Sequence, residues 1–76
     1  MRALIETSVD LGRLVRRLRE DNGFSQRELA SRLGVSQRYL YELETGKPKT
    51  ADDRYFRLLA ALGIRLTAET PDLRHD

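Results

Sequence analysis

The chain has no cysteine, no tryptophan and a single histidine, His75, among its 76 residues. Without cysteine there is neither a disulfide framework nor a thiolate metal site. One histidine near the C-terminal tip leaves no Ser/His/Asp set, and no glycine-rich phosphate loop is present. Paired carboxylates at Asp52 and Asp53 are better explained by capping of a helix than by acid–base catalysis. We therefore expect no enzyme activity, no catalytic residues, no metal and no cofactor.

Long apolar runs are also missing. The longest unbroken one, from Leu58 to Leu62, is far too short to span a bilayer, and the segment Met1 to Ile5 does not have the pattern of a signal peptide. The 39% hydrophobic and 34% charged residues are typical of a globular chain and not of a disordered one. The sequence predicts one domain over residues 1–76, located in the cytoplasm and without a membrane partner.

Positive charge is concentrated in the first two thirds of the chain. Residues 1–50 carry ten Lys/Arg and seven Asp/Glu, whereas residues 51–76 carry four and five. The first part is therefore the better surface for an anionic partner.

Apolar spacing predicts four helices, over residues 8–21, 25–33, 36–44 and 51–62. Each begins at a residue suited to an N-cap: Thr7 or Ser8, Ser25 with Glu28 closing a capping box, Ser36, and Thr50. Glycines end them, and Gly34 is expected to stop the second helix in a tight turn. The packed core is expected to span residues 8–62.

The periodicity changes after the fourth helix. Residues 64–69 alternate apolar and polar side chains, as a strand does. A lone strand needs a backbone partner, and we expect the same strand of a second copy across a two-fold axis, with residues 2–6 as a possible outer strand. The simpler interpretation is an extended tail. Residues 70–76 are expected to form a flexible tail. The residues expected to support dimerisation are Tyr55, Leu62, Ile64 and Leu66.

The second and third predicted helices, joined by a glycine turn, have the layout of a DNA-binding helix-turn-helix. Such a helix fits the major groove, where Gln pairs with adenine and Arg with guanine. The third helix presents Gln37 and Arg38 at its start, with Tyr41 and Glu42 as further candidates for base contacts, although Glu42 can instead orient Arg38. The candidates for phosphate contacts are Gln26, Arg27, Ser36, Lys47 and Lys49.

Residues 11–62 resemble the lambda-repressor-like, or XRE, helix-turn-helix family. The matching residues are Arg19, Gly23, Ser25-Gln26, Glu28-Leu29-Ala30, Gly34-Val35-Ser36 and Glu44-Thr45-Gly46-Lys47. The resemblance implies a compact all-α domain of four to five helices, in which helix 36–44 enters the DNA groove. It also implies a structural ion pair between Arg19 and Glu44. Arg38 stands where the family often has Gln or a small residue, so the operator sequence does not transfer.

The end of the chain is similar to that of the HipB-type antitoxins. In those proteins a helix is followed by a strand that pairs between subunits of a small dimeric repressor. The resemblance implies a transcriptional repressor that binds a palindromic operator as a homodimer and neutralises a kinase-like toxin protein. Two alternatives stay open: a phage-type repressor without a toxin partner, and a protein-interaction module that only sequesters another protein.

Overall fold

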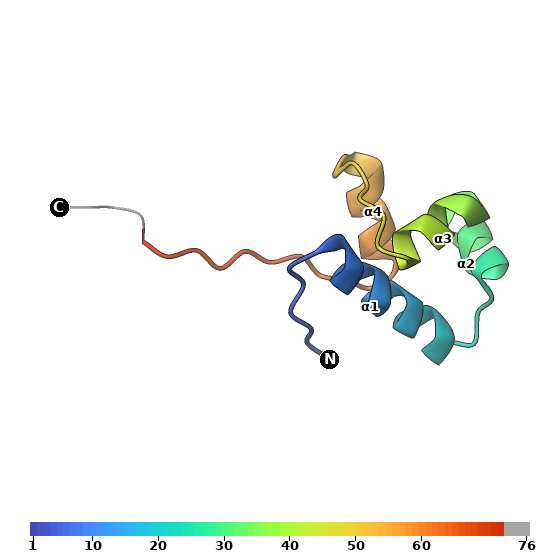
Figure 1. Cartoon of the computed structure of the whole chain (residues 1–76), viewed down its shortest axis with the longest axis horizontal. Helices are drawn as coiled ribbons and strands as arrows, with labels where there is room; N and C mark the ends of the chain where they lie inside the picture. Colours follow the sequence, from blue (N-terminus) through green and yellow to red (C-terminus); the bar gives the residue numbers. More distant parts are fainter. Residues whose placement is uncertain (73–76) are drawn as a thin grey trace.

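The computed structural model of the chain describes residues 1–72. Figure 1 shows four helices in the order α1 (Ser8–Asp21), α2 (Gln26–Leu33), α3 (Gln37–Glu44) and α4 (Asp53–Ala61). Within residues 1–72 the structure is all-helical, as predicted, with loops between the helices and no strand. The expectations about His75 and the end of the tail lie outside the described residues.

Capping side chains fix the starts of α1 and α2. Thr7 caps α1, and the carboxylate of Asp10 accepts the backbone N–H groups of Glu6 and Thr7 at 3.0 and 3.2 Å. In the same way Ser25 caps α2, and Glu28 accepts the Ser25 N–H at 2.9 Å. These backbone hydrogen bonds favour the charged carboxylates and so lower the pKa of Asp10 and of Glu28. The predicted capping box of α2 is confirmed.

A tight turn connects α2 to α3. Gly34 adopts the left-handed conformation with φ of 70°, which a residue without a Cβ reaches without strain. The Val35 N–H then donates back to the Ala30 carbonyl at 3.0 Å. Two residues after the glycine, Ser36 caps α3 by accepting the Tyr39 N–H at 3.0 Å. The chain therefore leaves one helix and begins the next within three residues, which gives the helix-turn-helix arrangement that the sequence predicted.

The predicted bounds of the fourth helix were wrong. It begins at Asp53 and not at residue 51, and its N-cap is Asp52 and not Thr50. Asp52 has an extended backbone, and its carboxylate accepts the Tyr55 N–H at 3.0 Å. A carboxylate caps a helix as well as a hydroxyl does, and its negative charge also suits the positive end of the helix. Asp52 therefore caps α4 in place of Thr50. Ala61 is the last residue of α4, one residue before the predicted end.

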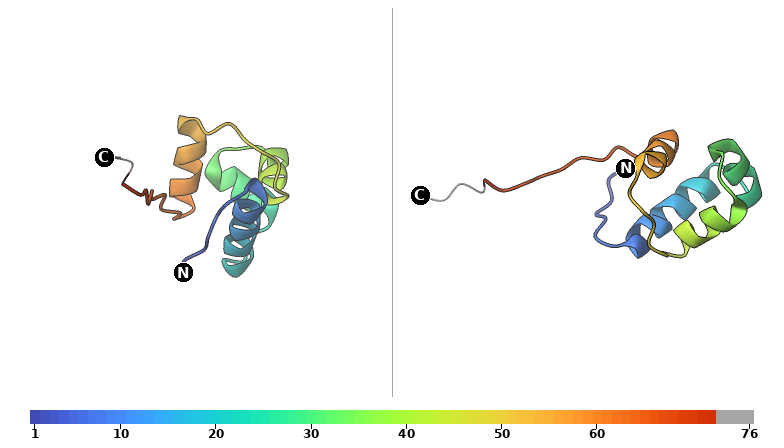
Figure 2. Two further views of the ribbon diagram at one scale, coloured as in Figure 1. Left: turned by 60° about the vertical axis from the view of Figure 1, so that its left-hand side comes forward. Right: turned by 90° about the horizontal axis from the view of Figure 1, so that it is seen from above.

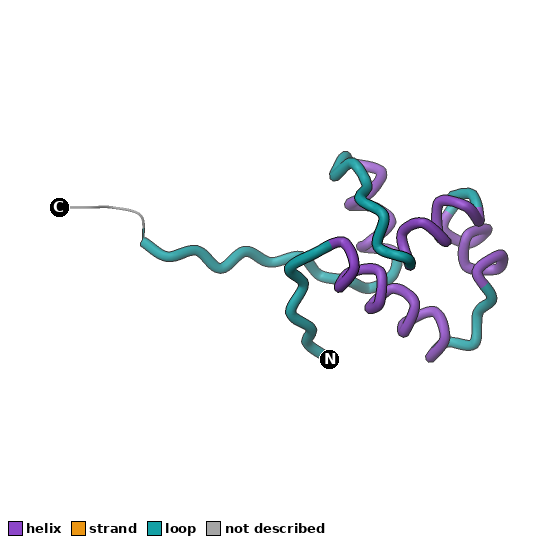
Figure 3. Tube along the Cα trace, viewed as in Figure 1, coloured by secondary structure: helices purple, strands orange, loops and turns teal. Residues whose placement is uncertain are grey.

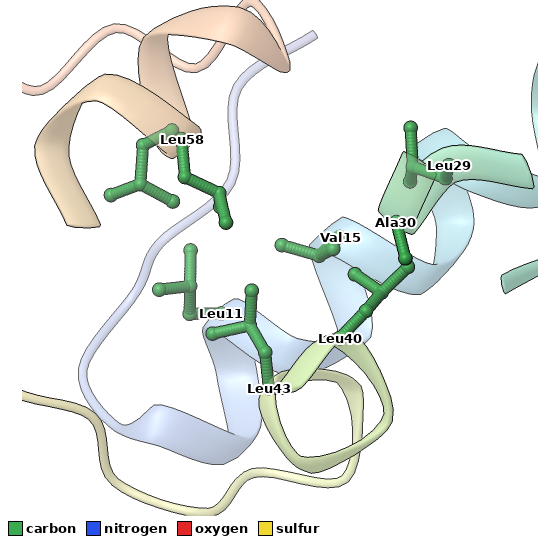
Figure 4. Close-up of a cluster of buried hydrophobic side chains, with 8 residues drawn as sticks. Leu11, Val15, Leu29, Ala30, Leu40, Leu43 and Leu58 are labelled. Carbon is green, nitrogen blue, oxygen red and sulfur yellow. The ribbon is translucent and has the colours of Figure 1, made fainter. Parts of the chain in front are cut away.

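The core lies where all four helices converge. Eight buried apolar side chains form it, most of them leucine: Leu11, Val15, Leu29, Ala30, Leu40, Leu43, Leu58 and Leu59. Figure 4 shows this cluster between the helices. Because α3 packs against both α1 and α2, it is held along its inner face and keeps a fixed orientation.

The backbones of α1 and α3 approach each other at Gly12. A Cβ placed on Gly12 would meet the Leu43 carbonyl oxygen, and it would lie 2.7 Å from the Glu44 carbonyl oxygen. Only a residue without a side chain fits there, so this glycine sets the spacing between the two helices.

A buried ion pair also joins α1 to α3. The Arg19 Nε and Nη2 atoms donate to the Glu44 carboxylate at 2.7 and 3.0 Å, and Arg19 Nη1 donates to the Phe24 carbonyl at 2.9 Å. The two side chains are only 12% and 2% exposed. The hydrogen bonds to Glu44 raise the pKa of Arg19. The ion pair that the family resemblance implied is thus present, and it also fixes the turn before α2.

Both ends of the described chain leave the helical body as loops. After a turn at Gly63 and the half-buried Ile64, residues 65–72 run as an extended segment away from the helices, and Figure 3 shows them as loop. Residues 64–69, expected as a strand, do not pair with another strand in the single chain. Figure 2 shows the N-terminal arm leaving from the start of α1, and Arg2 reaches Glu69 at 4.0 Å. No helix in the described part of the chain has the length and apolar character needed to cross a membrane.

Candidate nucleic-acid interface

The outward face of α3 carries exposed polar side chains. Gln37 and Arg38 lie in its first turn, and Tyr41 follows one turn later with 55% of its surface exposed. The Arg38 side chain is 85% exposed and lies 3.7 Å from Glu42. Leu40 and Leu43 on the opposite side are buried. The face is therefore open to a partner, while the inner side of the same helix is anchored in the core.

Glu42 is turned partly inward and holds two lysines of the loop that follows α3. Lys49 Nζ lies 2.7 Å from one carboxylate oxygen, and Lys47 Nζ lies 2.9 Å from the other. Hydrogen bonds from Lys49 and then Lys47 lower the pKa of Glu42 to about 2. Glu42 was predicted as a base contact, but in the free chain its oxygens are already occupied by the lysines.

Lys47 and Lys49 differ in how much solvent they meet. The Lys47 side chain is 61% exposed, whereas that of Lys49 is only 13% exposed. Lys49 Nζ also lies 4.4 Å from the centre of the Tyr39 ring, and the Arg54 guanidinium lies 4.6 Å from the same centre. Lys47 is thus available to a phosphate, while Lys49 is embedded in a cluster that links α3 to α4.

The remaining residues predicted to contact phosphates also differ in how free their side chains are. Arg27 is exposed on α2. Gln26 is half-buried and donates to Glu44 at 3.2 Å, and the Ser36 hydroxyl caps α3. Gln26 therefore also links α2 to α3, Ser36 fixes the start of α3, and Arg27 is the freest of the three. Among residues 1–72 no group of three or more His, Cys, Asp or Glu side chains is placed to hold a metal ion.

The residues predicted for dimerisation do not form one exposed patch. Tyr55, Leu62 and Ile64 are half-buried and pack against the core of their own chain. Leu66 is 55% exposed and Phe56 is 48% exposed. The Phe56 and Tyr55 rings meet edge-on, with their centres 6.1 Å apart. Of the aromatic pair on α4, Tyr55 is the one that turns inward, and Phe56 faces outward.

Two features of the site were missed by sequence reasoning. One is the pairing of Glu42 with Lys47 and Lys49, and its signal was available: Gly46, with φ of 89°, ends α3, and the Lys47 N–H donates back to the Glu42 carbonyl at 2.9 Å. The other is the stacking of Arg54 on Tyr39, which joins residues 15 positions apart and has no local signal.

Comparison with known proteins agrees with this geometry. The helix-turn-helix family (HTH_3) matches residues 15–68. An HTH-type transcriptional regulator, y4mF of Sinorhizobium fredii, is 36% identical over 70 residues, which are 92% of each chain. Among solved structures, a chain of the HipA–HipB–O2–O3 complex is similar, with a TM-score of 0.72, 25% identity and coverage of 91% and 97%. The restriction-modification controller protein C.AhdI from Aeromonas hydrophila is also similar, with a TM-score of 0.64, 31% identity and coverage of 76% and 88%.

The chain belongs to the helix-turn-helix family. It is an XRE-type transcriptional regulator, and its family consists of DNA-binding regulators and is not a class of enzymes.

Proposed function

We propose that the chain is a sequence-specific transcriptional repressor of the cytoplasm that binds a palindromic operator as a homodimer. The observation that carries this proposal is the open face of α3, with Gln37, Arg38 and Tyr41 exposed on a helix whose other side is buried. An α-helix fits the major groove, and residues at its N-terminal end reach the base edges.

In this mechanism, different residues contact the bases and the phosphates. Gln37 and Arg38 read bases, because Gln matches adenine and Arg matches guanine through paired hydrogen bonds. Tyr41 lies beside them and offers its ring to a thymine methyl or its hydroxyl to a phosphate. Arg27 and Lys47 contact the backbone, which adds affinity that falls as salt rises.

Binding to DNA is tested by titrating the purified protein with the DNA upstream of its own gene and with random DNA over a range of salt concentrations. We expect tighter binding to the upstream fragment and a steep decrease in affinity with salt for both fragments. A protein that binds neither fragment, or shows no salt dependence, would not be an operator-binding repressor.

We propose that residues 64–69 pair with the same residues of a second copy. Ile64 packs against the core, and the residues after it are extended and leave the helical body, where Leu66 exposes an apolar side chain that a partner strand would cover. Such pairing would place the two α3 helices about 34 Å apart, one turn of DNA, so that they read adjacent major grooves.

The pairing is tested by comparing Leu66→Pro with Leu66→Ala. Proline removes a backbone donor from the strand as well as the apolar side chain, whereas alanine removes only the side chain. We expect Leu66→Pro to weaken both the dimer, measured by analytical ultracentrifugation, and operator binding. A Leu66→Pro dimer as stable as the wild type rejects the inter-subunit strand.

We further propose that the repressor is the antitoxin of a type II toxin–antitoxin pair and neutralises a kinase-like toxin. The support is similarity to a chain of the HipA–HipB–O2–O3 complex over 91% of this chain. Co-expression with the protein encoded by the adjacent gene tests this proposal. We expect the neighbour alone to arrest growth, and this chain to restore growth and to copurify with the neighbour.

Similarity to C.AhdI, at 31% identity, favours a second candidate: a regulator that controls its target genes without a toxin partner. In that case the operator would be bound as above, but the adjacent gene product would neither arrest growth nor bind the chain. The co-expression experiment thus separates the two candidates, while the DNA titration tests what they share.

A further inference from the structure

A groove of about 480 Å³ lies between the α2–α3 turn and α4. Its apolar lining includes Leu33 and Val35 at the turn and Leu58 on α4, and its charged lining consists of arginines. These arginines are Arg32, Arg54 and Arg57. No acidic residue lines the groove, so its positive charge is not balanced from within.

Two of the three guanidinium groups are held in place by aromatic rings. The Arg32 guanidinium lies 4.5 Å from the centre of the Phe24 ring, and that of Arg54 lies 4.6 Å from the centre of the Tyr39 ring. Stacking on a ring orients a guanidinium while its N–H groups stay available as donors.

Within residues 1–72, none of the three arginines has a carboxylate oxygen within 4.0 Å, although the charge of Arg32 helps to lower the pKa of Glu28. Among the described residues, the ion pairs within 4.0 Å involve Arg2, Arg16, Arg17, Arg19 and Arg38 together with Lys47 and Lys49. Oriented guanidiniums that make no close ion pair suit an external carboxylate, to which each can make paired hydrogen bonds.

We propose that this groove is a docking site for an acidic segment of a partner protein, in which Asp or Glu side chains alternate with apolar ones. The acids pair with Arg32, Arg54 and Arg57, and the apolar side chains cover Leu33 and Val35. This inference goes beyond the proposed function, because it requires neither an operator nor a dimer.

The composition of the groove favours a protein segment over a DNA backbone. A DNA backbone presents phosphates and sugars and gains little from an apolar lining, whereas a peptide uses both halves of the groove. The exposed residues of α3, Gln37, Arg38 and Tyr41, do not line the groove. Occupation of the groove therefore leaves the reading face of α3 open.

The experiment uses the full chain and a fluorescent peptide in which Asp and Glu alternate with Leu. The matched peptide has Asn and Gln in place of the acids. Fluorescence anisotropy measures binding, and amide chemical-shift mapping locates it. We expect the acidic peptide to bind and to shift the signals of Gly34 and Ala61, which both line the groove, and the neutral peptide not to bind.

Three variants define the site. We expect Arg57→Gln to weaken peptide binding about tenfold, since one charge-assisted pair is lost. Ala61→Glu should abolish binding, because it adds a carboxylate to the groove, and circular dichroism confirms that the helices are intact. Arg13→Gln, on an exposed part of α1, is the matched control and should bind as the wild type does.

Two results would overturn the proposal. One is equal binding of the acidic peptide to the wild type, Arg57→Gln and Ala61→Glu. The other is displacement of the peptide by upstream DNA together with loss of DNA affinity in Arg57→Gln, which would make the groove a phosphate contact. A failure of the repressor proposal would give a different result: the wild type would not bind DNA but would still bind the acidic peptide.

Discussion

Glu42, in the last turn of α3, accepts a hydrogen bond at 2.7 Å from Nζ of Lys49, which lies in the loop that follows the helix. Lys47 occupies the other carboxylate oxygen at 2.9 Å. The negative charge of Glu42 is therefore shared by two lysines that would otherwise add to the positive potential beside α3. This relationship makes Glu42 a residue that controls how strongly the surface attracts any polyanion.

We expect Glu42→Gln to increase affinity for random DNA and to reduce the preference for upstream over random DNA. Without the Glu42 charge, Lys47 is free to pair fully with its phosphate, which steepens the dependence of log affinity on log salt by up to about 0.9. Salt-titrated binding measures both quantities. Glu20→Gln, which removes an exposed carboxylate paired with Arg16, is the control and should change the slope less. An unchanged slope in Glu42→Gln would show that Lys47 does not reach phosphate.

Stability should depend on pH through Glu42. Its pKa falls from an ordinary value of 4.5 to about 2 in the folded chain, because Lys49 and Lys47 favour the charged form. The stabilisation is therefore fully present above pH 4.5 and is lost as pH falls toward 2. We expect the melting temperature to fall more steeply in the wild type than in Glu42→Gln over this range. Parallel curves for the two proteins would contradict the assignment.

Arg38→Ala and Arg27→Ala should have different effects on DNA recognition. We expect Arg38→Ala to cost about 1–3 kcal/mol of specific binding and to relax the preference at one base pair. Arg27→Ala should weaken binding to all sequences alike and reduce the salt slope by about 1. Binding to a panel of single-base variants of the upstream site distinguishes the two. A uniform loss in Arg38→Ala would make Arg38 a phosphate contact.

Gly12→Ala should destabilise the fold even though alanine is the better helix former. The added Cβ would meet backbone oxygens of Leu43 and Glu44, which have little freedom to move, so α1 and α3 must separate. Overpacking of this kind costs about 1–3 kcal/mol, more than the gain of about 1 kcal/mol from helix propensity. Urea denaturation measures the difference, with Arg13→Ala on the exposed side as control. A stabilised Gly12→Ala protein would contradict the close approach.

Local signals in the sequence were enough to place three of the helices and the turn between α2 and α3. Ser25, Glu28, Gly34 and Ser36 act on backbone groups within a few residues of themselves, so their effect is visible in the order of residues alone. The start of α4 was misplaced because Thr50 and Asp52 are both good caps, and local chemistry does not rank them.

The sequence by itself therefore determined the helix-turn-helix and the exposed residues Gln37, Arg38 and Tyr41, since periodicity fixes which side of a helix faces the core. Tertiary structure alone decided that Arg54 stacks on the Tyr39 ring, and that Arg32, Arg54 and Arg57 surround one groove. These groups come from separate segments, and their proximity depends on how the helices pack, which no local pattern of residues specifies.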